Sequence, residues 1–385
     1  MAEMTPRERL LAAIRFEGPD RIPLSPGLHQ LASKRVQRYG GNRFEQYLKL
    51  AEEYGIDPII EIGIPPNCFN STVGFDYSVL KDVKVEIKEE VKSNAIYYRR
   101  KFETPAGILT DVIMKPTGPE YGYNPMLCIK EGMVKGEEDL DKIPFLFFPP
   151  ELLDPKGEIR KRQKEIGDRG LGAYMIRGAL DCRAGYCREI ADMMVDYYDN
   201  YDFFKKHIMI HHQHSLSLIK AALEAGAEVI NGSWYFTGIS AGWSPKIIKE
   251  EFIPLIKEQA ELVKSYNAIY MIYDDGKVMG ILDMLKDTGI DLLETCAPPP
   301  AGDFELQKAR EIVGKSYAFK GGMDQTDVIY RRTPEFIEEK VKEIMLAADP
   351  SGGFILSTGD SILQETPERN VKALIDAGKK YGRLK

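Results

Sequence analysis

Short apolar segments alternate with helix signals through the second half of the chain, and this alternation constrains the fold more than any other feature. Short, largely apolar segments without a strict polar–apolar alternation predict strands that are buried on both faces of a parallel sheet. Six such runs cover residues 172–180, 227–235, 268–273, 290–295, 316–320 and 353–357. Helix N-terminal signals stand between them, as at Ser244-Pro245, Thr333-Pro334-Glu335 and Thr366-Pro367-Glu368. Such alternation predicts a parallel sheet with right-handed crossovers.

The first half of the chain adds two buried strands, at residues 22–25 and 57–62, and one segment of a different kind. Residues 77–115 alternate between apolar and polar side chains, which predicts an antiparallel β insertion with one exposed face. Eight strands, most of them followed by a helix, favour an α/β fold in which residues 1–385 form one (β/α)8 TIM-barrel domain, with the insertion after the second strand. An open doubly wound sheet is the alternative.

Charge and composition exclude several classes of protein. The net charge of −7 argues against nucleic-acid binding, and no apolar run reaches the roughly 18 residues of a membrane helix. The N-terminal residues lack the apolar core of a signal peptide, so the sequence predicts a cytoplasmic protein. The five cysteines have neither disulfide-framework nor zinc-site spacing and are expected to be free thiols; they are Cys68, Cys128, Cys182, Cys187 and Cys296.

Acidic residues gather where the predicted strands end. The strand at 268–273 runs directly into Asp274-Asp275-Gly276, and in parallel α/β folds the chemistry takes place beyond the carboxyl ends of the strands. Many carboxylates around one end of a barrel repel one another unless protons, a cation or a cationic substrate are present. A metal ion, or acid–base chemistry with raised pKa values, is therefore one hypothesis. The alternative is that about half of these acids cap helix N-termini.

Three histidines, His207, His211 and His214, share one face of a predicted helix, because they lie four and three residues apart. No Glu or Cys completes a recognisable metal motif beside them, so we expect packing or surface roles, with metal binding as the alternative. The spacing of Cys182 and Cys187 fits no known zinc or redox pattern either.

Several segments of the chain resemble the uroporphyrinogen decarboxylase superfamily. Residues 5–23, Thr-Pro-Arg-Glu-Arg-Leu-Leu-Ala-Ala-Ile-Arg-Phe-Glu-Gly-Pro-Asp-Arg-Ile-Pro, are similar to the start of many members, and Gly-Gly-Phe-Ile-Leu-Ser-Thr-Gly-Asp at 352–360 is similar to a segment near their end. The middle agrees through Trp234, the Tyr-Asp-Asp-Gly run that begins at Tyr273, and residues 294–303. The resemblance covers nearly the whole chain and implies a (β/α)8 barrel.

The decarboxylase branch of that superfamily is the weaker match. Its members carry an Arg-Gln-Ala-Gly-Arg segment after the first strand that grips substrate carboxylates, whereas this chain reads Ser-Pro-Gly-Leu-His-Gln-Leu-Ala at 25–32 and has no further arginine until Arg35. Asp57 is the candidate match to the family's substrate-binding aspartate, although it precedes a proline early in its strand. An acidic site also repels a substrate with several carboxylates.

The cobalamin-dependent methyltransferase branch, including proteins similar to O-demethylase components, resembles the chain more. In its coenzyme M members, zinc is held by His-x-Cys after the fifth strand and by a Cys after the eighth; the matching residues here are Tyr273, Asp275 and Asp360. Carboxylates suit harder cations than thiolates do, so thiol methylation at that zinc site is not expected. A phenyl methyl ether instead needs a proton or a Lewis acid at its leaving oxygen.

The resemblance therefore implies a corrinoid-dependent methyltransferase that moves a methyl group from a small donor, such as an aromatic methyl ether, to a separate corrinoid protein. No Asp-x-His-x-x-Gly segment is present, so the cobalamin is expected on that partner. Expected catalytic residues are Tyr273, Asp275, Glu294 and Asp360, and a divalent metal such as zinc would be bound by Asp275, Glu294 and Asp360. Expected substrate-binding residues are His29, Glu61, Arg177, Asp181, Trp234, Cys296, Met323 and Asp324.

Two other functions stay open at this point. One is a decarboxylase of the uroporphyrinogen decarboxylase type, and the other is a non-catalytic barrel that binds a small ligand, since one fold hosts many functions. The loss of both the arginine segment and the zinc ligands is what a silent barrel would show. Trp234, Tyr235 and Phe236 are expected either to wall a small-molecule pocket or to pack in the core. A homodimer is compatible with the sequence.

Overall fold

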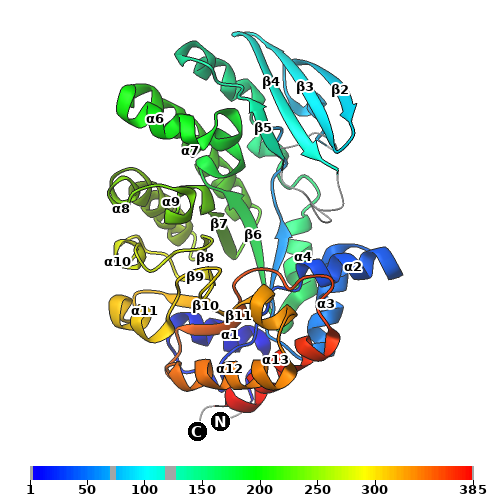
Figure 1. Ribbon diagram of the computed structural model, residues 1–385, viewed down its shortest axis with the longest axis vertical. Coiled ribbons are helices and arrows are strands. Elements are labelled where there is room, and N and C mark those ends of the chain that lie inside the picture. The colour runs from blue at the N-terminus through cyan, green and yellow to red at the C-terminus, as the bar shows by residue number, and fades with distance from the viewer. Residues whose placement is uncertain (1–2, 70–74, 118–126, 384–385) are drawn as a thin grey trace. The chain divides into compact units, whose positions relative to one another are not determined.

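The computed structural model describes residues 3–69, 75–117 and 127–383 (Figure 1). The chain forms two compact units, each built from segments that are discontinuous in sequence. The first unit consists of Met1–Ile64, Lys156–Met175 and Ala222–Lys385, and the second consists of Pro65–Pro155 and Ile176–Ala221.

A seven-stranded sheet lies at the centre of the first unit, in the order β1-β6-β7-β8-β9-β10-β11. Its strands are β1 (Ile59–Gly63), β6 (Leu171–Arg177), β7 (Val229–Ser233), β8 (Ile269–Tyr273), β9 (Leu292–Cys296), β10 (Ala318–Met323) and β11 (Phe354–Thr358). Each strand pairs with the next strand of this sheet along the chain, and the order never reverses as it would in a doubly wound sheet. The predicted α/β fold with a parallel sheet is confirmed.

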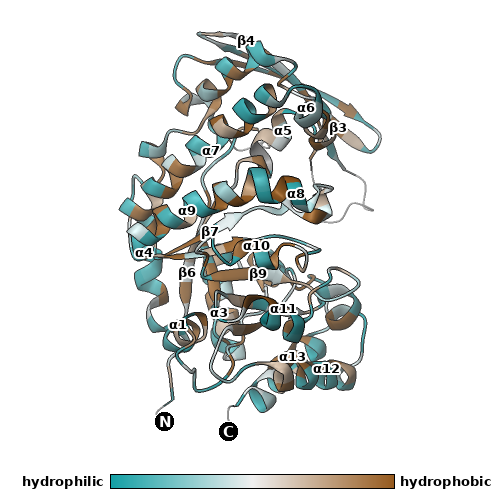
Figure 2. Cartoon of the chain, turned by 90° about the vertical axis from the view of Figure 1, so that its left-hand side faces the viewer, coloured by the Kyte–Doolittle hydropathy of each residue, from teal (hydrophilic) through white to brown (hydrophobic). Residues whose placement is uncertain are grey.

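Helices separate most of these strands. They are α1 (Pro6–Arg15), α2 (His29–Tyr39), α3 (Arg43–Tyr54), α4 (Glu158–Ile166), α8 (Pro245–Ile247), α9 (Ile253–Ser265), α10 (Leu282–Leu285), α11 (Leu306–Val313), α12 (Pro334–Ala347) and α13 (Glu368–Tyr381). In Figure 2, strands β6 and β9 are largely hydrophobic, whereas helices such as α11 alternate hydrophilic and hydrophobic residues. This is the pattern of a buried sheet covered by amphipathic helices.

Local sequence signals account for most of these helices but not for α2. Thr5 caps α1 and, with Glu8, forms a capping box. Helix α2 was not predicted, and its first turn begins after Leu28, which has no side-chain oxygen with which to cap it. Its start therefore carries no signal that sequence reasoning could detect.

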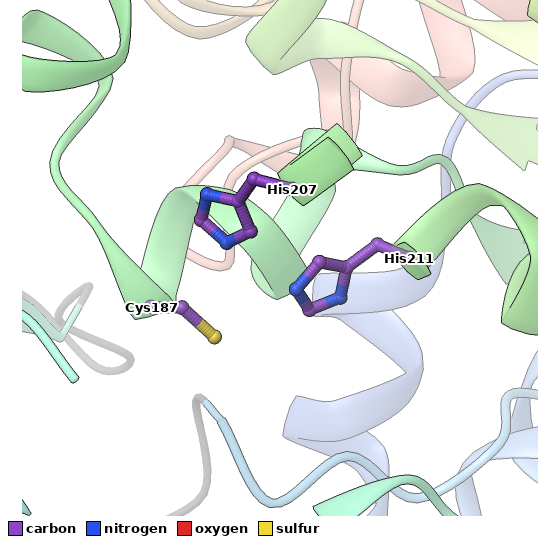
Figure 3. Close-up of side chains that lie close together, drawn as sticks. All are labelled: Cys187, His207 and His211. Carbon is purple, nitrogen blue, oxygen red and sulfur yellow. The ribbon is translucent and has the colours of Figure 1, made fainter. Parts of the chain in front are cut away.

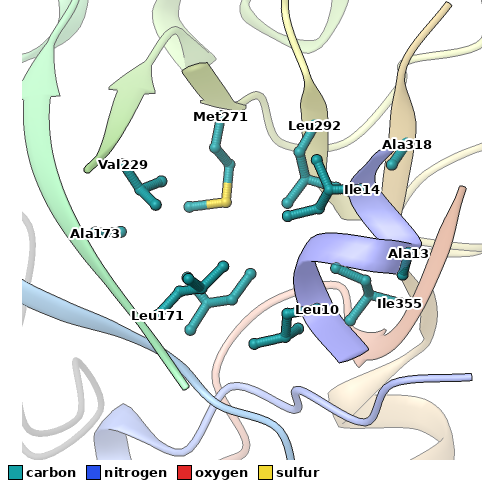
Figure 4. Packing of buried hydrophobic residues seen from close by; sticks show 11 residues of the cluster. Leu10, Ala13, Ile14, Leu171, Ala173, Val229, Met271, Leu292, Ala318 and Ile355 are labelled. Carbon is teal, nitrogen blue, oxygen red and sulfur yellow. The ribbon is translucent and has the colours of Figure 1, made fainter. Parts of the chain in front are cut away.

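Helix α1 packs against the end of the sheet at which the strands begin (Figure 4). Its apolar face contributes Leu10, Ala13 and Ile14 to one buried cluster. The cluster also contains residues from all seven strands, namely Ile59, Leu171, Ala173, Val229, Met271, Leu292, Ala318 and Ile355. Adjacent strands lie about 4.8 Å apart, so the edge strands of a flat seven-stranded sheet would be about 29 Å apart and could not meet one helix. The sheet is therefore curled around α1.

The predicted first strand, residues 22–25, forms isolated bridges instead of a ladder. Leu24 makes a parallel bridge with Leu356 of β11, and its carbonyl accepts a hydrogen bond of 2.7 Å from the amide of Asp57. Pro23 and a second proline three residues later have no N–H to donate, so a continuous ladder cannot form here. The segment nevertheless lies between β11 and the residues that lead into β1.

Asp57 is the centre of a buried ion-pair network. Its carboxylate accepts hydrogen bonds from Arg9 at 2.5 Å, from Arg21 at 3.0 Å and from the amide of Leu24 at 2.9 Å, and the residue is fully buried. It precedes β1 and therefore lies at the amino end of the strand, away from the carboxyl ends where chemistry is expected. Its contacts indicate that it stabilises the fold.

The second unit contains an antiparallel sheet in the order β2-β3-β4-β5, which confirms the predicted antiparallel β structure, although the fourth strand lies beyond the predicted end at residue 115. Arg100 and Asp111 form a fully buried ion pair across two of its strands, with 2.8 Å between Nε and Oδ1. Its strands are β2 (Lys84–Lys92), β3 (Ala95–Thr104), β4 (Gly107–Pro116) and β5 (Cys128–Glu131), and its helices are α5 (Gly185–Cys187), α6 (Ile190–Asp199) and most of α7 (Tyr201–Glu224). Within the described ranges, no helix is both long and apolar enough to cross a membrane.

Candidate active site at the carboxyl ends of the strands

Both carboxylate oxygens of Glu294, in β9 of the parallel sheet, are hydrogen-bonded. Its Oε2 accepts a hydrogen bond of 2.8 Å from Nζ of Lys320, and its Oε1 accepts one of 2.6 Å from Nδ2 of Asn231. The three side chains come from β9, β10 and β7, and all are buried. Buried carboxylates are normally paired and hydrogen-bonded, and these two contacts fix the orientation of the Glu294 side chain.

The backbone next to Glu294 is strained. Thr295 has a φ of +60°, which a β-branched residue rarely adopts, and its hydroxyl donates to the carbonyl of Asp274 at 2.7 Å. The register between β9 and β10 shifts between Phe319 and Gly321, so that Lys320 lies at an irregularity. Irregular backbone of this kind changes the direction in which side chains point. Both irregularities lie next to the Glu294–Lys320 pair.

Tyr273 and Asp275 form a second polar pair, at the end of β8. The phenol of Tyr273 donates to Oδ2 of Asp275 at 2.6 Å, and both residues are half-buried. Burial raises the pKa of the Tyr273 phenol, and the negative charges of Asp275 and Asp360 raise it further. The phenol therefore keeps its proton at any physiological pH and acts as a donor.

Asp360 follows β11 and is crowded by protein atoms although its side chain is exposed. This crowding raises the pKa of its carboxyl, and the charge of Glu294 adds to the rise, while a hydrogen bond from the amide of Ser361 and the charge of Lys320 oppose it. We refer to Asn231, Tyr273, Asp275, Glu294, Lys320 and Asp360 as the polar cluster.

His29 and Glu61 lie in the same unit as the polar cluster. The ring of His29 lies 5.0 Å from that of Tyr47, and burial lowers the pKa of His29 to about 3, with the charges of Arg43 and Lys320 contributing. His29 is therefore a neutral imidazole. Glu61 forms an ion pair with Arg43, so its carboxylate is already occupied by a cation.

Four further predicted substrate-binding residues of this unit are mostly interior. Trp234 is 1% exposed, and its indole N–H donates to the hydroxyl of Tyr270 at 3.0 Å. Cys296 and Met323 are buried, and Asp324 caps the helical turn that follows it. These contacts agree with the core and capping alternatives, and they leave the substrate-binding roles as predictions.

The aromatic residues after Trp234 lie closer to the polar cluster. Tyr235 and Phe236 are half-buried, and the ring of Tyr235 meets that of Tyr273 edge-on at 6.1 Å. An aromatic ring beside a phenol donor can hold a second ring by edge contact. Of the predicted aromatic wall, Tyr235 is therefore the residue that the structure brings beside a predicted catalytic side chain.

The remaining predicted residues belong to the second unit. Arg177 ends β6 and its carbonyl accepts from the hydroxyl of Ser215 at 2.9 Å, while Asp181 is fully buried in the turn that follows. The same unit contains a three-residue group suited to a metal, made of Cys187, His207 and His211.

The metal role predicted for Asp275, Glu294 and Asp360 remains a prediction. Among the described residues, these carboxylates do not form a group in which all three ligand atoms lie within 4.8 Å of one another.

Sequence reasoning missed Asn231 and Lys320 and gave Cys187, His207 and His211 only a minor role. A signal for Lys320 did exist: a lysine between Phe319 and Gly321, inside a buried parallel strand, is rare unless it is paired. No comparable signal linked Cys187 to His207, because they lie twenty residues apart on different helices. Such pairs become neighbours only through folding.

Residues 172–381, just over half of the chain, match the family described as uroporphyrinogen decarboxylase (URO-D). The chain is similar to uroporphyrinogen decarboxylase of Trichodesmium erythraeum, with 26% identity over 164 residues, 42% of this chain and 43% of that protein. It is also similar to the enzyme of the same name from Synechocystis sp., with 24% identity over 168 residues, 43% of this chain and 45% of that protein. The matched part spans less than half of these relatives.

A solved methyltransferase from Methanosarcina mazei shares the fold, with a TM-score of 0.63 over 98% of this chain and 99% of that chain. Its sequence is 17% identical, so the likeness concerns the fold alone. The evidence for the family is the sequence match, which agrees with the resemblance of the N-terminal, central and C-terminal segments. The protein belongs to the uroporphyrinogen decarboxylase (URO-D) family.

Proposed function

We propose that this protein is a corrinoid-dependent methyltransferase that takes a methyl group from a small donor, such as an aromatic methyl ether, and passes it to a separate corrinoid protein. The observation that carries the proposal is the polar cluster, in which the protonated phenol of Tyr273 donates to Asp275 and the pKa of the nearby Asp360 is raised. Proton donors held beside an aromatic ring suit a reaction whose leaving group is a phenolate. The methyltransferase of the same fold is compatible with it.

The proposal includes a closed (β/α)8 barrel. The segment 22–25, bridged to Leu356 on one side and bonded to Asp57 on the other, would be its eighth strand. The curl of the sheet around α1 supports this closure. In such a barrel the polar cluster would lie at the carboxyl-terminal mouth, where a donor and a partner protein could both reach it.

In the proposed reaction, the bond between the methyl carbon and the ether oxygen breaks, and the oxygen leaves with the electron pair. Asp360, whose pKa is raised, is the acid that gives a proton to that oxygen. Tyr273 holds Asp275 by its hydroxyl and thereby fixes the position of that carboxylate. The Glu294–Lys320 pair supplies a fixed dipole that needs no reorganisation during the reaction.

The corrinoid, when its partner protein delivers it, is the methyl acceptor. The donors of this chain do not fit the thiolate zinc site of the coenzyme M branch, because the matching positions hold a protonated phenol and two carboxylates. We therefore derive no step through zinc at the polar cluster. Here the proton, and not a Lewis acid, neutralises the leaving oxygen. A cytoplasmic location and a homodimer remain predictions of the sequence.

Decarboxylation is the second candidate, and the names of the similar relatives favour it. A porphyrinogen decarboxylase must bind several substrate carboxylates. Lys320, a cation of the polar cluster, is already paired with Glu294 at 2.8 Å, and the other charged groups of that cluster are acids. The charges of the cluster thus favour the methyltransferase over the decarboxylase.

The test uses the full-length protein with cob(I)alamin and a panel of methoxylated aromatic compounds, and it follows methylcobalamin formation in the visible spectrum. We expect methylcobalamin with at least one donor, and loss of that signal in Asp275→Asn. Asp287→Asn, which changes an exposed aspartate of the first unit, is the matched control and should keep the rate. Release of carbon dioxide from uroporphyrinogen without methyl transfer would establish the decarboxylase instead. Binding of a donor without turnover would indicate a silent barrel.

A further inference from the structure

Cys187, His207 and His211 form a compact group in the second unit that the proposed methyl transfer does not use. Their ligand atoms all lie within 4.8 Å of one another, and all three residues are buried. Figure 3 shows the thiol of Cys187 and a ring nitrogen of each histidine pointing toward the same space. Metal–ligand bonds of about 2.0–2.3 Å place the donors of a tetrahedral zinc site about 3.3–3.8 Å apart, so small side-chain rotations would complete the geometry.

Local structure holds the three side chains in place. His207 and His211 lie four residues apart on α7 and therefore share one helix face, with ring centroids 5.3 Å apart. This is the spacing at which two histidines of one helix bind zinc in metalloproteases. Cys187 ends the short helix α5, and its carbonyl accepts a hydrogen bond of 2.8 Å from the amide of Val134. The thiol is thus presented by an anchored backbone.

His207 lacks the contacts that a buried imidazole normally makes. It is 1% exposed, and among the described residues neither of its ring nitrogens has a hydrogen-bond partner. A buried polar group without a partner costs about 1–3 kcal/mol, and native structures rarely leave one without a reason. A metal ion bound to one ring nitrogen would supply that reason.

The cation whose charge acts on His207, that of Arg188, is already paired. Arg188 follows Cys187 directly, and its guanidinium donates to both carboxylate oxygens of Asp196, at 2.5 and 2.9 Å. The cation of Arg188 therefore does not prevent a metal ion from binding beside it. A thiolate would in turn offset part of the charge of the metal.

We propose that Cys187, His207 and His211 bind a transition-metal ion, with Zn²⁺ as the ion assigned. Thiolate and imidazole are ligands that zinc prefers, and the group contains no carboxylate, which argues against Mg²⁺ and Ca²⁺. No fourth His, Cys, Asp or Glu of the described ranges joins the group. Three protein ligands leave one position of a tetrahedral ion for water or for a small exchangeable ligand.

Aromatic rings enclose part of this site. The rings of Phe69 and Phe147 meet that of His211 edge-on at 5.5 and 5.3 Å, and the ring of Phe203 stacks on that of His207 at 6.2 Å. The carbonyl of Phe69 is held by the buried Arg100 at 3.1 Å. Apolar walls favour a small ligand of low charge at the fourth position, such as a single water molecule, hydroxide or a thiolate.

The experiment measures metal bound to the full-length protein, independently of methyl transfer. The protein is stripped with a chelator, reloaded with Zn²⁺ or Co²⁺, dialysed and analysed by mass spectrometry for metal content. We expect about one ion per chain. Reloading with Co²⁺ should give a thiolate-to-cobalt charge-transfer absorption in the near ultraviolet. Cys187→Ser should abolish this absorption, and His207→Gln should lower the metal content at least tenfold at equal free zinc.

Three controls test whether these three residues, and not another part of the chain, bind the metal. Cys128→Ser changes a half-buried cysteine outside the group and should keep both the metal and the charge-transfer band. Asp275→Asn should lose methyl transfer but keep the metal. The methyl-transfer proposal and the metal-site proposal can therefore fail independently of each other. If Asp275→Asn loses the metal, or if Cys187→Ser keeps it, the assignment is overturned. Circular dichroism and thermal unfolding of each apo variant show that lost metal does not reflect lost folding.

Discussion

Nζ of Lys320 lies 2.8 Å from Oε2 of Glu294, and both side chains are about nine-tenths buried. With Asn231 on the other oxygen, the carboxylate is held from two sides by residues of two other strands. This arrangement fixes the orientation of the Glu294 carboxylate. The polar cluster thus has a paired part around Glu294 and a second part at Tyr273, Asp275 and Asp360, in which the pKa values of Tyr273 and Asp360 are raised.

Removing the cation of this pair should destabilise the protein strongly. Lys320→Met leaves Glu294 buried without its ion partner, which costs about 3–5 kcal/mol in comparable buried pairs. Urea unfolding measures this free energy. The exposed pair of Lys308 and Glu305 provides the control, since Lys308→Met should cost less than about 1 kcal/mol. A Lys320→Met variant that unfolds like the wild type would show that Glu294 is not held as a buried charge.

Replacing Tyr273 by phenylalanine should reduce the rate of methyl transfer without unfolding the protein. The change removes only the hydroxyl that holds Asp275 at 2.6 Å. Positioned proton donors contribute about 10²–10⁴-fold to catalysis, and a group that acts through its neighbour is expected near the lower end. The readout is kcat with the best methyl donor, compared with Tyr330→Phe, a change at an exposed tyrosine. Equal rates in the two variants would remove Tyr273 from the mechanism.

The activity should fall as the pH rises, because Asp360 must carry a proton. Crowding by protein atoms and the charge of Glu294 raise its pKa in the folded state above the ordinary value of 3.8. The acid is therefore lost as the pH rises through this folded pKa, and the charged form of Asp360 destabilises the folded protein above pH 3.8.

The variant Asp360→Asn tests both effects. We expect the variant to be at least as stable as the wild type at pH 7 and to lose methyl transfer. Any methyl transfer that remains should not slow down as the pH rises. A pH–rate profile and thermal unfolding at pH 5 and pH 8 measure the two effects. If Asp360→Asn were less stable than the wild type at pH 7, this would contradict a raised pKa of Asp360.

Acid should destabilise the protein in part through His29. Burial lowers the folded pKa of His29 to about 3, whereas the unfolded value is 6.5. The unfolded state then binds more protons between these values, so stability is full above pH 6.5 and falls as the pH is lowered toward 3. Each pKa unit corresponds to about 1.36 kcal/mol, which bounds the effect at about 4–5 kcal/mol.

The comparison of wild type with His29→Gln isolates this contribution, because the two proteins differ only at residue 29. The free energy of unfolding at pH 7 and at pH 5 is the quantity to measure. We expect the difference between the two pH values to be smaller in the variant. Equal differences would mean that the imidazole of His29 reaches water in the folded protein.

Much of the fold could be predicted from residues that are neighbours in sequence. The predicted helix signals at Ser244 and Thr333 are observed as the N-caps of α8 and α12. Such signals are local, because a cap or an apolar stripe involves residues within one or two helical turns. The alternation of strands and helices predicted the parallel sheet for the same reason. Helix α2, which begins without a side-chain cap, was missed.

What the tertiary structure alone decided is which distant residues meet. Glu294 was predicted as a site residue, but its partners Asn231 and Lys320 come from other strands and were not predicted. Cys187 meets His207 and His211 because α5 and α7 pack in the same unit, and no local pattern encodes that packing. The sequence determined the elements and the types of chemical group at their ends. Folding decided which of these groups are buried together, and burial sets the pairing and the pKa values on which the proposed chemistry depends.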